Sequence, residues 1–291
     1  MLVHIKKIIK NAKKDGYAVG AFNVHNLESI LGVARAAVEA KSPAIIQVSE
    51  GAIKYMGLKP VTHIVSTVAK NTAAIVPIAL HLDHGKSFES VFGCINAGFS
   101  SVHIDASDLP LDENISLSKQ VVEVAHSKKA WVQGEVGAIM GGHGASGNTI
   151  SNIPIAKLED VIKFVKKSGV DTIAAAVGTA HGVYENEDIL IGLLSDIKKA
   201  TKIPFVLHGG SGVKVDKIKN AIRHGVNIIN IGSDIKIAFS NTLKETCKNN
   251  PDEIDPRNLL KPSIEAVKTV VIEQMKLFGS AGQVKVEDIE T

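Results

Sequence analysis

Eight short apolar runs, separated by segments of helical period, constrain the fold more than any other feature of this sequence. The runs are residues 18–23, 44–48, 76–82, 101–105, 130–136, 172–178, 204–208 and 228–232. Near-continuous apolar strands that alternate with helices are typical of a parallel sheet covered by helices. Eight such units in about 250 residues predict an α/β fold, the closed (β/α)₈ or TIM barrel.

An open, doubly wound sheet is the alternative arrangement of such units. It is disfavoured because no Gly-x-Gly-x-x-Gly motif opens a helix after the first strand. No linker of low complexity divides the chain, so we expect one barrel domain over residues 1–291. Pro251, Pro256 and Pro262 mark a C-terminal helical extension from about residue 251 to 291, with a last helix near 263–278.

Composition and charge exclude several classes of protein. The formal net charge is +3 and no basic tract carries interleaved aromatic residues, so nucleic acid is not an expected partner. The basic amphipathic segment 1–16 has an apolar run too short for a signal peptide or a membrane span. Cys94 and Cys247 stand alone, as free thiols of a reducing compartment do. We therefore expect a cytoplasmic protein without membrane association.

Polar side chains stand at the carboxyl end of every predicted strand. The stretch HLDHG, residues 81–85, is the clearest case, because Asp83 and His84 directly follow an apolar run. The other residues at or just after strand ends are Asn23, Ser49, Asp105, Glu135, His181, His208, Asn230 and Ser233. In a (β/α)₈ barrel these ends meet on one face, which carries the active site. The pattern therefore predicts an enzyme site rather than solvated turns.

Three of the histidines indicate a metal. His84, His181 and His208 come from three different strands and can present three imidazoles to one point. Three protein ligands with an open fourth position are typical of a catalytic zinc site. Neutral imidazole also suits other divalent ions, so the residues alone leave the identity of the metal open.

Four further ionisable residues lie near the same strand ends. His81 and His103 each precede a strand-end aspartate by two residues, so they share its strand face. We interpret both as packed or supporting residues rather than as ligands. Asp105 and Glu135 either orient the histidines or hold a second cation, and spacing does not separate these roles.

Two glycine-rich stretches follow the last two predicted strands: HGGSGV at 208–213 and NIGSD at 230–234. Glycines let backbone amides approach an anion, and these loops are the usual phosphate site of a (β/α)₈ barrel. Predicted strands three to eight contain no lysine, which disfavours Schiff-base chemistry. The residues therefore predict a metal-dependent lyase or isomerase acting on a sugar phosphate.

Motifs along nearly the whole chain resemble those of the class II, metal-dependent fructose-bisphosphate aldolases, which belong to the ketose-bisphosphate aldolase family. They are AFNVHN (21–26), SEGA (49–52), HLDHG (81–85), GFSSVHIDAS (98–107), GEVG (134–137), GTAHGVY (178–184), LHGGSG (207–212), NIGSD (230–234), DPRNLLKP (255–262) and LFGSAG (277–282). Their number and order make the resemblance specific.

The resemblance implies a role for each strand-end residue. His84, His181 and His208 would bind catalytic Zn²⁺, and Asp83 would exchange a proton with the substrate's C4 hydroxyl. Asp105 and Glu135 match positions that hold a second, more labile divalent ion, and a monovalent cation near Gly182 and Gly209 is a family feature. The residues implied in substrate binding are Asn23, Ser49, Gly182, Gly209, Gly210, Ser211, Asn230, Ile231, Gly232, Ser233 and Arg257.

The implied reaction is the reversible cleavage of fructose 1,6-bisphosphate into dihydroxyacetone phosphate and glyceraldehyde 3-phosphate through a zinc-stabilised enediolate. Tagatose 1,6-bisphosphate, another phosphorylated ketose or a deoxy-sugar acid phosphate are alternative substrates. A catalytically impaired barrel that binds a sugar phosphate is the alternative from another functional class. Arg257 would reach the distal phosphate across a dimer interface, so a homodimer or homotetramer is expected.

The loop at 138–154, AIMGGHGASGNTISNIP, departs from the family pattern. The family carries acidic residues here, one of which removes a proton from C3 of dihydroxyacetone phosphate, but this loop has no Asp or Glu. The glycine content predicts a mobile lid. His143 is the strongest base in the loop and is one hypothesis for the proton acceptor. A changed substrate and a base from elsewhere are the other two.

Overall fold

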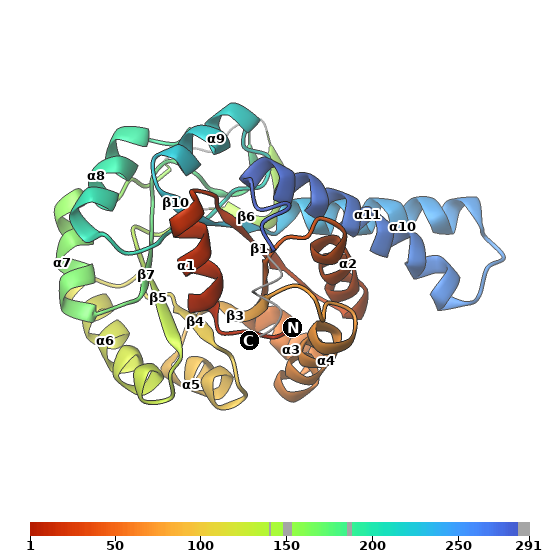
Figure 1. Ribbon diagram of the computed structural model, residues 1–291, viewed down its shortest axis with the longest axis horizontal. Coiled ribbons are helices and arrows are strands. Elements are labelled where there is room, and N and C mark those ends of the chain that lie inside the picture. Colours follow the sequence, from red (N-terminus) through yellow and green to blue (C-terminus); the bar gives the residue numbers. More distant parts are fainter. Residues whose placement is uncertain (140, 148–152, 185–187, 285–291) are drawn as a thin grey trace.

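Eight parallel strands close into a barrel, in the order β1-β10-β9-β7-β5-β4-β3-β2 (Figure 1). The computed structural model describes residues 1–139, 141–147, 153–184 and 188–284, with only the backbone of 141–147 and 183–184. The predicted (β/α)₈ barrel is confirmed, and each of the eight predicted strands overlaps one barrel strand. Their bounds are β1 Val19–Asn23, β2 Ala44–Ser49, β3 Ile78–Gly85, β4 Ser101–Ile104, β5 Trp131–Val136, β7 Thr172–Ala175, β9 Phe205–Leu207 and β10 Val226–Ile231.

Helices surround the barrel and cover the outward side chains of its strands (Figure 1). Leu80 and Leu82 of β3 and Phe205 of β9 are among the outward residues buried in this layer. Burying each such side chain contributes about 1.5–3 kcal/mol, which is why the strands read as continuous apolar runs. The covering helices are α2 Leu27–Glu39, α3 Glu50–Met56, α4 Leu58–Asn71, α5 Phe88–Asn96, α6 Leu111–Ser127, α7 Leu158–Ser168, α8 Ile191–Thr201 and α9 Val215–Arg223.

The amino-end opening of the barrel is filled by helix α1, Ile5–Asp15. Its buried residues Ile5, Ile8, Ile9 and Ala12 follow the 3.6-residue helical period and form one apolar face. They share a core cluster with inward strand residues such as Ala79. The predicted basic amphipathic segment is thus a helix whose apolar face completes the barrel interior. Among the described residues, no helix has the length and apolarity needed to cross a membrane.

The barrel interior changes from apolar to polar along β3. On β3, alternate positions carry Ala79, His81 and Asp83 toward the inside, all of them buried. The parallel register places Gln47 of β2 beside His81, and Ser49 beside Asp83. Because strand side chains alternate between faces, this pattern places buried polar groups on the inward face toward the carboxyl end.

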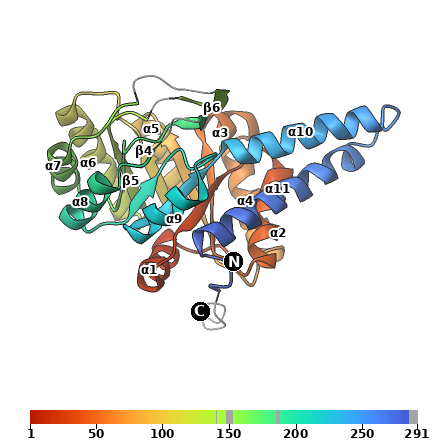
Figure 2. The ribbon, with the colours of Figure 1, turned by 90° about the horizontal axis from the view of Figure 1, so that it is seen from above.

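Two long helices project from the barrel as an antiparallel pair (Figures 1 and 2). They are α10, Ser233–Asn249, and α11, Pro256–Phe278. The last helix therefore begins seven residues before the predicted 263. Pro256 occupies the first turn, where a missing N–H costs nothing, and Asp255 caps it by accepting a hydrogen bond from the Arg257 amide. Pro262 lies inside the helix and was wrongly interpreted as preceding it.

A second, two-stranded sheet was not predicted. Strand β6, Gly141–Gly147, pairs in parallel with β8, His181–Tyr184. Figure 2 shows β6 on the side of the barrel opposite to α1. The sequence prediction gave the segment 138–154 as a loop, because glycine has low strand propensity. His143 lies within β6, but its side chain lies outside the described part of the structure.

Candidate metal centre and substrate pocket

Two histidine nitrogens face each other at the carboxyl end of the barrel. Nε2 of His84 lies 3.1 Å from Nδ1 of His208. Two imidazoles bound to one tetrahedral zinc ion have their nitrogens about 3.3 Å apart, given bonds of about 2.0–2.1 Å. His84 adopts a left-handed backbone conformation with φ of +50°, which is uncommon for a residue other than glycine and tends to cluster at functional sites.

A third predicted ligand, His181 at the start of β8, lies beside this pair. Its ring centroid is 4.9 Å from that of His84 and 5.7 Å from that of His208. The structure thus brings together all three histidines predicted from the sequence. The closest group of ligand atoms, however, has a different composition.

That group consists of His84, His103, Glu135 and His208, whose ligand atoms all lie within 4.8 Å of one another. Nε2 of His103 and Oε2 of Glu135 are buried and have no hydrogen-bond partner in the described part of the structure. Buried polar atoms are rarely left in this state, and a bound cation would satisfy the carboxylate. The cluster therefore fits a metal site, in which His103 and Glu135 lie close to the facing nitrogens of His84 and His208.

Asp105 contacts His84 on the side away from this cluster. Its Oδ2 lies 2.6 Å from His84 Nδ1 and accepts from Lys86 Nζ at 2.8 Å, while its Oδ1 accepts from the Ser107 hydroxyl at 2.7 Å. A carboxylate that holds one imidazole nitrogen directs the other toward a metal. Of the two roles left open from the sequence, these contacts favour orientation of His84.

Burial and charge have opposite effects on the pKa values in this cluster. Burial alone would lower the pKa of His84, but Asp83, Asp105 and Glu135 together raise that pKa to about 9. Burial raises the pKa of Glu135 to about 7 and lowers the pKa of His208 well below its usual value. The carboxyl groups around His84 thus favour positive charge at this point, which suits a bound cation.

Asp83 lies next to the cluster and is held by amide groups. Its Oδ1 is 3.8 Å from His84 Nε2. Asn23 Nδ2 donates to Asp83 Oδ2 at 2.7 Å, and Asn230 Nδ2 donates to Oδ1 at 3.5 Å. Gln47 in turn donates to Asn23 Oδ1 at 2.7 Å. Donors on both oxygens favour the ionised carboxylate, which is the form able to accept a proton.

Most residues predicted to bind substrate line a small cavity beside Asp83. Gly209 has a φ of +66°, and a Cβ there would lie 2.1 Å from the Ala180 carbonyl oxygen, so glycine is required. Gly210 and Ile231 are not among the lining residues, and Ile231 is buried in the outer core. The lining residues are Asn23, Asp83, His181, Gly182, Gly209, Ser211, Asn230, Gly232 and Ser233.

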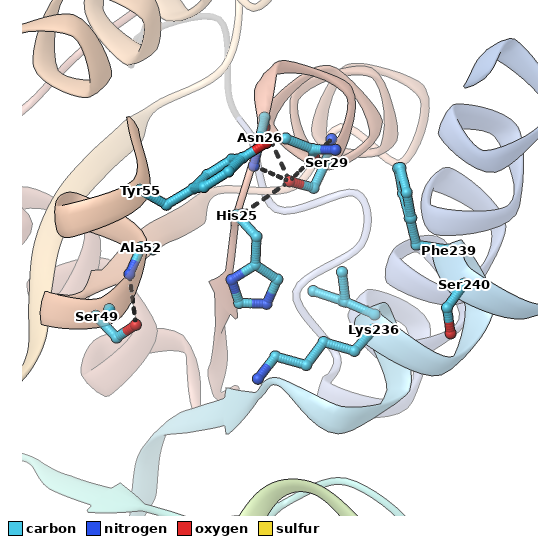
Figure 3. Close-up of a pocket in the computed structure, with 11 residues that line it drawn as sticks. His25, Asn26, Ser29, Ser49, Ala52, Tyr55, Lys236, Phe239 and Ser240 are labelled. Atoms are coloured by element: carbon cyan, nitrogen blue, oxygen red, sulfur yellow. Dashed lines mark hydrogen bonds between the residues drawn. The ribbon is translucent and has the colours of Figure 1, made fainter. Parts of the chain in front are cut away.

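A larger pocket, of about 530 Å³, opens beside this cavity between α2, α3 and α10 (Figure 3). Ser49 lies on its wall, and His25 and Lys236 extend into it (Figure 3). Burial lowers the pKa of the Lys236 amine, and the negative charge of Asp83 opposes that shift. Sequence analysis missed Lys236 as a site residue, although it follows Ser233 by three positions on one helix face.

Arg257, another predicted substrate-binding residue, also stands apart from its own chain's site. It lies in the first turn of α11, at the outer end of the projecting helix pair. Its side chain is 88% exposed, and Nη2 contacts Asp255 Oδ2 at 2.6 Å. Within one chain, Arg257 therefore does not join the pocket.

A (β/α)₈ barrel with a histidine–carboxylate cluster on its catalytic face defines a metal-dependent barrel enzyme. The profile of the family described as "Fructose-bisphosphate aldolase class-II" matches residues 3–283. The chain belongs to this family of carbon–carbon lyases, which confirms the resemblance predicted from its motifs.

Individual relatives align with this chain over nearly their full length. A fructose-bisphosphate aldolase of Geobacillus stearothermophilus is 40% identical, with 97% of this chain and 98% of the relative covered. A 6-phospho-5-dehydro-2-deoxy-D-gluconate aldolase of Bacillus licheniformis is 38% identical, with 97% and 96% covered. The crystal structure of the YdjI aldolase from Escherichia coli K12 superposes with a TM-score of 0.82 at 30% identity, covering 98% of this chain and 100% of that one.

Proposed function

We propose that this protein cleaves fructose 1,6-bisphosphate reversibly to dihydroxyacetone phosphate and glyceraldehyde 3-phosphate, with Zn²⁺ held by His84, His181 and His208. The observation that carries the proposal is the position of Asp83, 3.8 Å from His84 and at the wall of the glycine-lined cavity. When bound, the ion supplies Lewis-acid polarisation of a carbonyl group. A carboxylate beside that centre is placed to move a proton during carbon–carbon cleavage.

Asp83 acts as the base in the cleavage direction. It accepts the proton of the C4 hydroxyl as the C3–C4 bond breaks, and it returns this proton in condensation. Asn23 and Asn230 orient the carboxylate for this transfer through their hydrogen bonds. The 1% exposure of Asp83 keeps bulk water from competing for the same proton.

The two ends of the pocket support a substrate with two anionic groups. Glycines and serines of the small cavity, with Asn230, form one end and suit the phosphate of the dihydroxyacetone half. Lys236 supplies a cation in the larger pocket, where the other half of the ketose would extend (Figure 3). Ser49 and His25 add polar groups there, and Arg257 would reach the distal phosphate from a second subunit.

A second candidate substrate has a carboxylate in place of the distal phosphate. The Bacillus licheniformis relative, 38% identical, is named for 6-phospho-5-dehydro-2-deoxy-D-gluconate. The ammonium group of Lys236 is a point charge that suits either anion. Tagatose 1,6-bisphosphate differs from the fructose compound only at C4 and remains a further alternative. A second divalent ion at Asp105 and Glu135, and a monovalent cation near Gly182 and Gly209, stay predictions.

The base that abstracts the C3 proton stays a prediction as well. His143 is our candidate because the loop at 138–154 contains no carboxylate. The His143→Ala variant should lose C3 proton exchange of dihydroxyacetone phosphate while keeping zinc. Normal exchange by this variant would remove His143 from the mechanism.

The experiment that tests the function is a side-by-side cleavage assay of fructose bisphosphate, tagatose bisphosphate and the phosphorylated deoxy-gluconate. Each is measured in the metal-loaded protein, after chelation, and after Zn²⁺ is restored. We expect cleavage that chelator removes and zinc restores, fastest for fructose 1,6-bisphosphate. Failure of the fully metallated protein to cleave any of them would instead support the sugar-phosphate-binding barrel.

A further inference from the structure

Gln133 is a buried side chain that the reaction described above does not use. It lies on β5, where alternate residues point into the barrel, so Gln133 and Glu135 share the inward face. Glu135 reaches the metal cluster, whereas Gln133 lies one inward position below it. Both side chains are buried, with exposures of 2% and 1%. The strand pairs on both sides, with His103 of β4 and Thr172 of β7 opposite Gln133, so its backbone is firmly held.

The Gln133 amide contacts His208 on the side of the ring that faces away from His84. The distance between Gln133 Nε2 and His208 Nε2 is 2.7 Å, and His208 Nδ1 lies 3.1 Å from His84 Nε2. The two nitrogens of one imidazole thus have different neighbours. Nδ1 faces the metal cluster, and Nε2 faces a neutral amide.

An imidazole that gives its Nδ1 lone pair to a metal carries its proton on Nε2. The group opposite Nε2 must then accept a hydrogen bond. A half-turn of the terminal amide of Gln133 places its Oε1 where Nε2 now lies, because the two atoms are nearly interchangeable in shape. Asn230 also lies near, at 3.3 Å, but its Nδ2 is directed to Asp83 as well. Gln133 is therefore the neighbour available to accept.

We propose that Gln133 is a positioning residue for the metal centre: its amide oxygen accepts the Nε2 proton of His208 and so fixes Nδ1 as the metal-binding nitrogen. The inference rests on the proposed zinc site. It adds a residue, one inward position before Glu135 on β5, that would orient a zinc ligand. Partners of this kind set the tautomer and the ring orientation, and losing one typically weakens metal affinity about 10–100-fold.

Two substitutions of similar volume separate hydrogen bonding from packing. Gln133→Glu keeps an acceptor opposite His208 Nε2, and Gln133→Met removes it. Zinc affinity is measured by competition with a chromophoric chelator, without substrate. We expect affinity about 10–100-fold weaker for Gln133→Met, and equal or tighter affinity for Gln133→Glu. In the Co²⁺-substituted protein, the visible ligand-field bands should shift for the Met variant and stay near the wild-type positions for the Glu variant.

The alternative is that Gln133 only fills space. Zinc binding by Gln133→Met as tight as wild type would overturn the proposal, and so would equal weakening in both variants. Thermal unfolding of the metal-free proteins identifies any variant that is misfolded. If wild-type protein binds no zinc, the proposed metal function itself fails. Normal zinc binding and cleavage by wild type, with no difference between the variants, would remove only the role of Gln133.

Discussion

Asn23 donates a hydrogen bond of 2.7 Å from its Nδ2 to Oδ2 of Asp83. Its own Oδ1 accepts from Gln47 at 2.7 Å, so the amide is fixed with its nitrogen toward the carboxylate. Gln47, which lies deeper in the barrel, therefore fixes the direction in which the Asn23 amide donates to Asp83. A relay of this kind acts on the ionisation of Asp83 as well as on its orientation.

We predict that Asn23→Asp moves the acidic limb of the kcat/KM profile to higher pH by at least about one unit. The substitution replaces a donor by a second carboxylate, and a like charge disfavours ionisation of Asp83, so its pKa rises. Asn23→Ala is the control that removes the donor without adding charge, and its limb should move less. Identical profiles for the two variants would show that Asn23 does not tune Asp83.

Lys236 should determine how tightly the distal half of the substrate binds. We predict that Lys236→Ala raises KM for fructose 1,6-bisphosphate about 10–100-fold, because a hydrogen bond to a charged group contributes about 1.5–3 kcal/mol. Proton exchange of dihydroxyacetone phosphate alone should not change, since that molecule has no distal group. The exposed Lys54→Ala on α3 is the matched control. Equal losses in both reactions would place Lys236 outside substrate recognition.

Arg257 can be tested by mixing two inactive proteins. The variants Asp83→Asn and Arg257→Ala are co-refolded in equal amounts, and cleavage at low substrate concentration is compared with each protein alone. If Arg257 acts across a dimer, half of the dimers are mixed and one of their two sites is intact. About a quarter of wild-type activity should then return. A mixture no more active than the sum of its components would rule out action between subunits.

Asp234 gives the fold a pH dependence of its own. Burial raises the pKa of Asp234 to about 6, although its hydrogen bonds with Ser211 and Gln274 act to lower that pKa. The folded state therefore holds this proton more tightly than the unfolded state, whose carboxyl titrates near pH 4. The protonated Asp234 carboxyl group therefore stabilises the folded state fully below about pH 4. This contribution to the free energy of unfolding is lost as the pH rises to about 6.

We predict that Asp234→Asn, which carries no ionisable group, does not lose stability between pH 4 and pH 6 through this position. Its free energy of unfolding should exceed that of wild type by about 1–2 kcal/mol at pH 7, and the difference should shrink toward pH 4. Urea unfolding of both proteins at four pH values between 4 and 7 checks this. A constant difference across the range would mean that Asp234 titrates normally in the folded protein.

The barrel could be predicted because its strands are buried on both sides. Such strands must be apolar along most of their length, so Ile78–Leu82 and its counterparts stand out from the helices between them. The polar strand ends were equally visible, because Asp83 and His208 stand at the ends of apolar runs and the other predicted strands end in the same way. For these elements, local pattern and tertiary position agree.

Other features depend on packing that the sequence pattern does not reveal. Strand β6 is glycine-rich, and its pairing with β8 comes from where the barrel places both segments. His103 was interpreted as a supporting residue, and how close it lies to the ligand atoms of His84, Glu135 and His208 could not be predicted from the sequence. Lys236 belongs to a helix, and which of its faces meets the pocket depends on how α10 leaves the barrel.

Helix α1 has a consequence for the chemistry at the opposite end. Its apolar face covers the amino-end opening of the barrel, whereas α1 leaves the carboxyl end uncovered. Asp83 and the histidines lie at the opposite, carboxyl end, so we expect substrate to enter from that side. A segment far from the reacting atoms thus separates the inward polar layer from solvent at the amino end of the barrel.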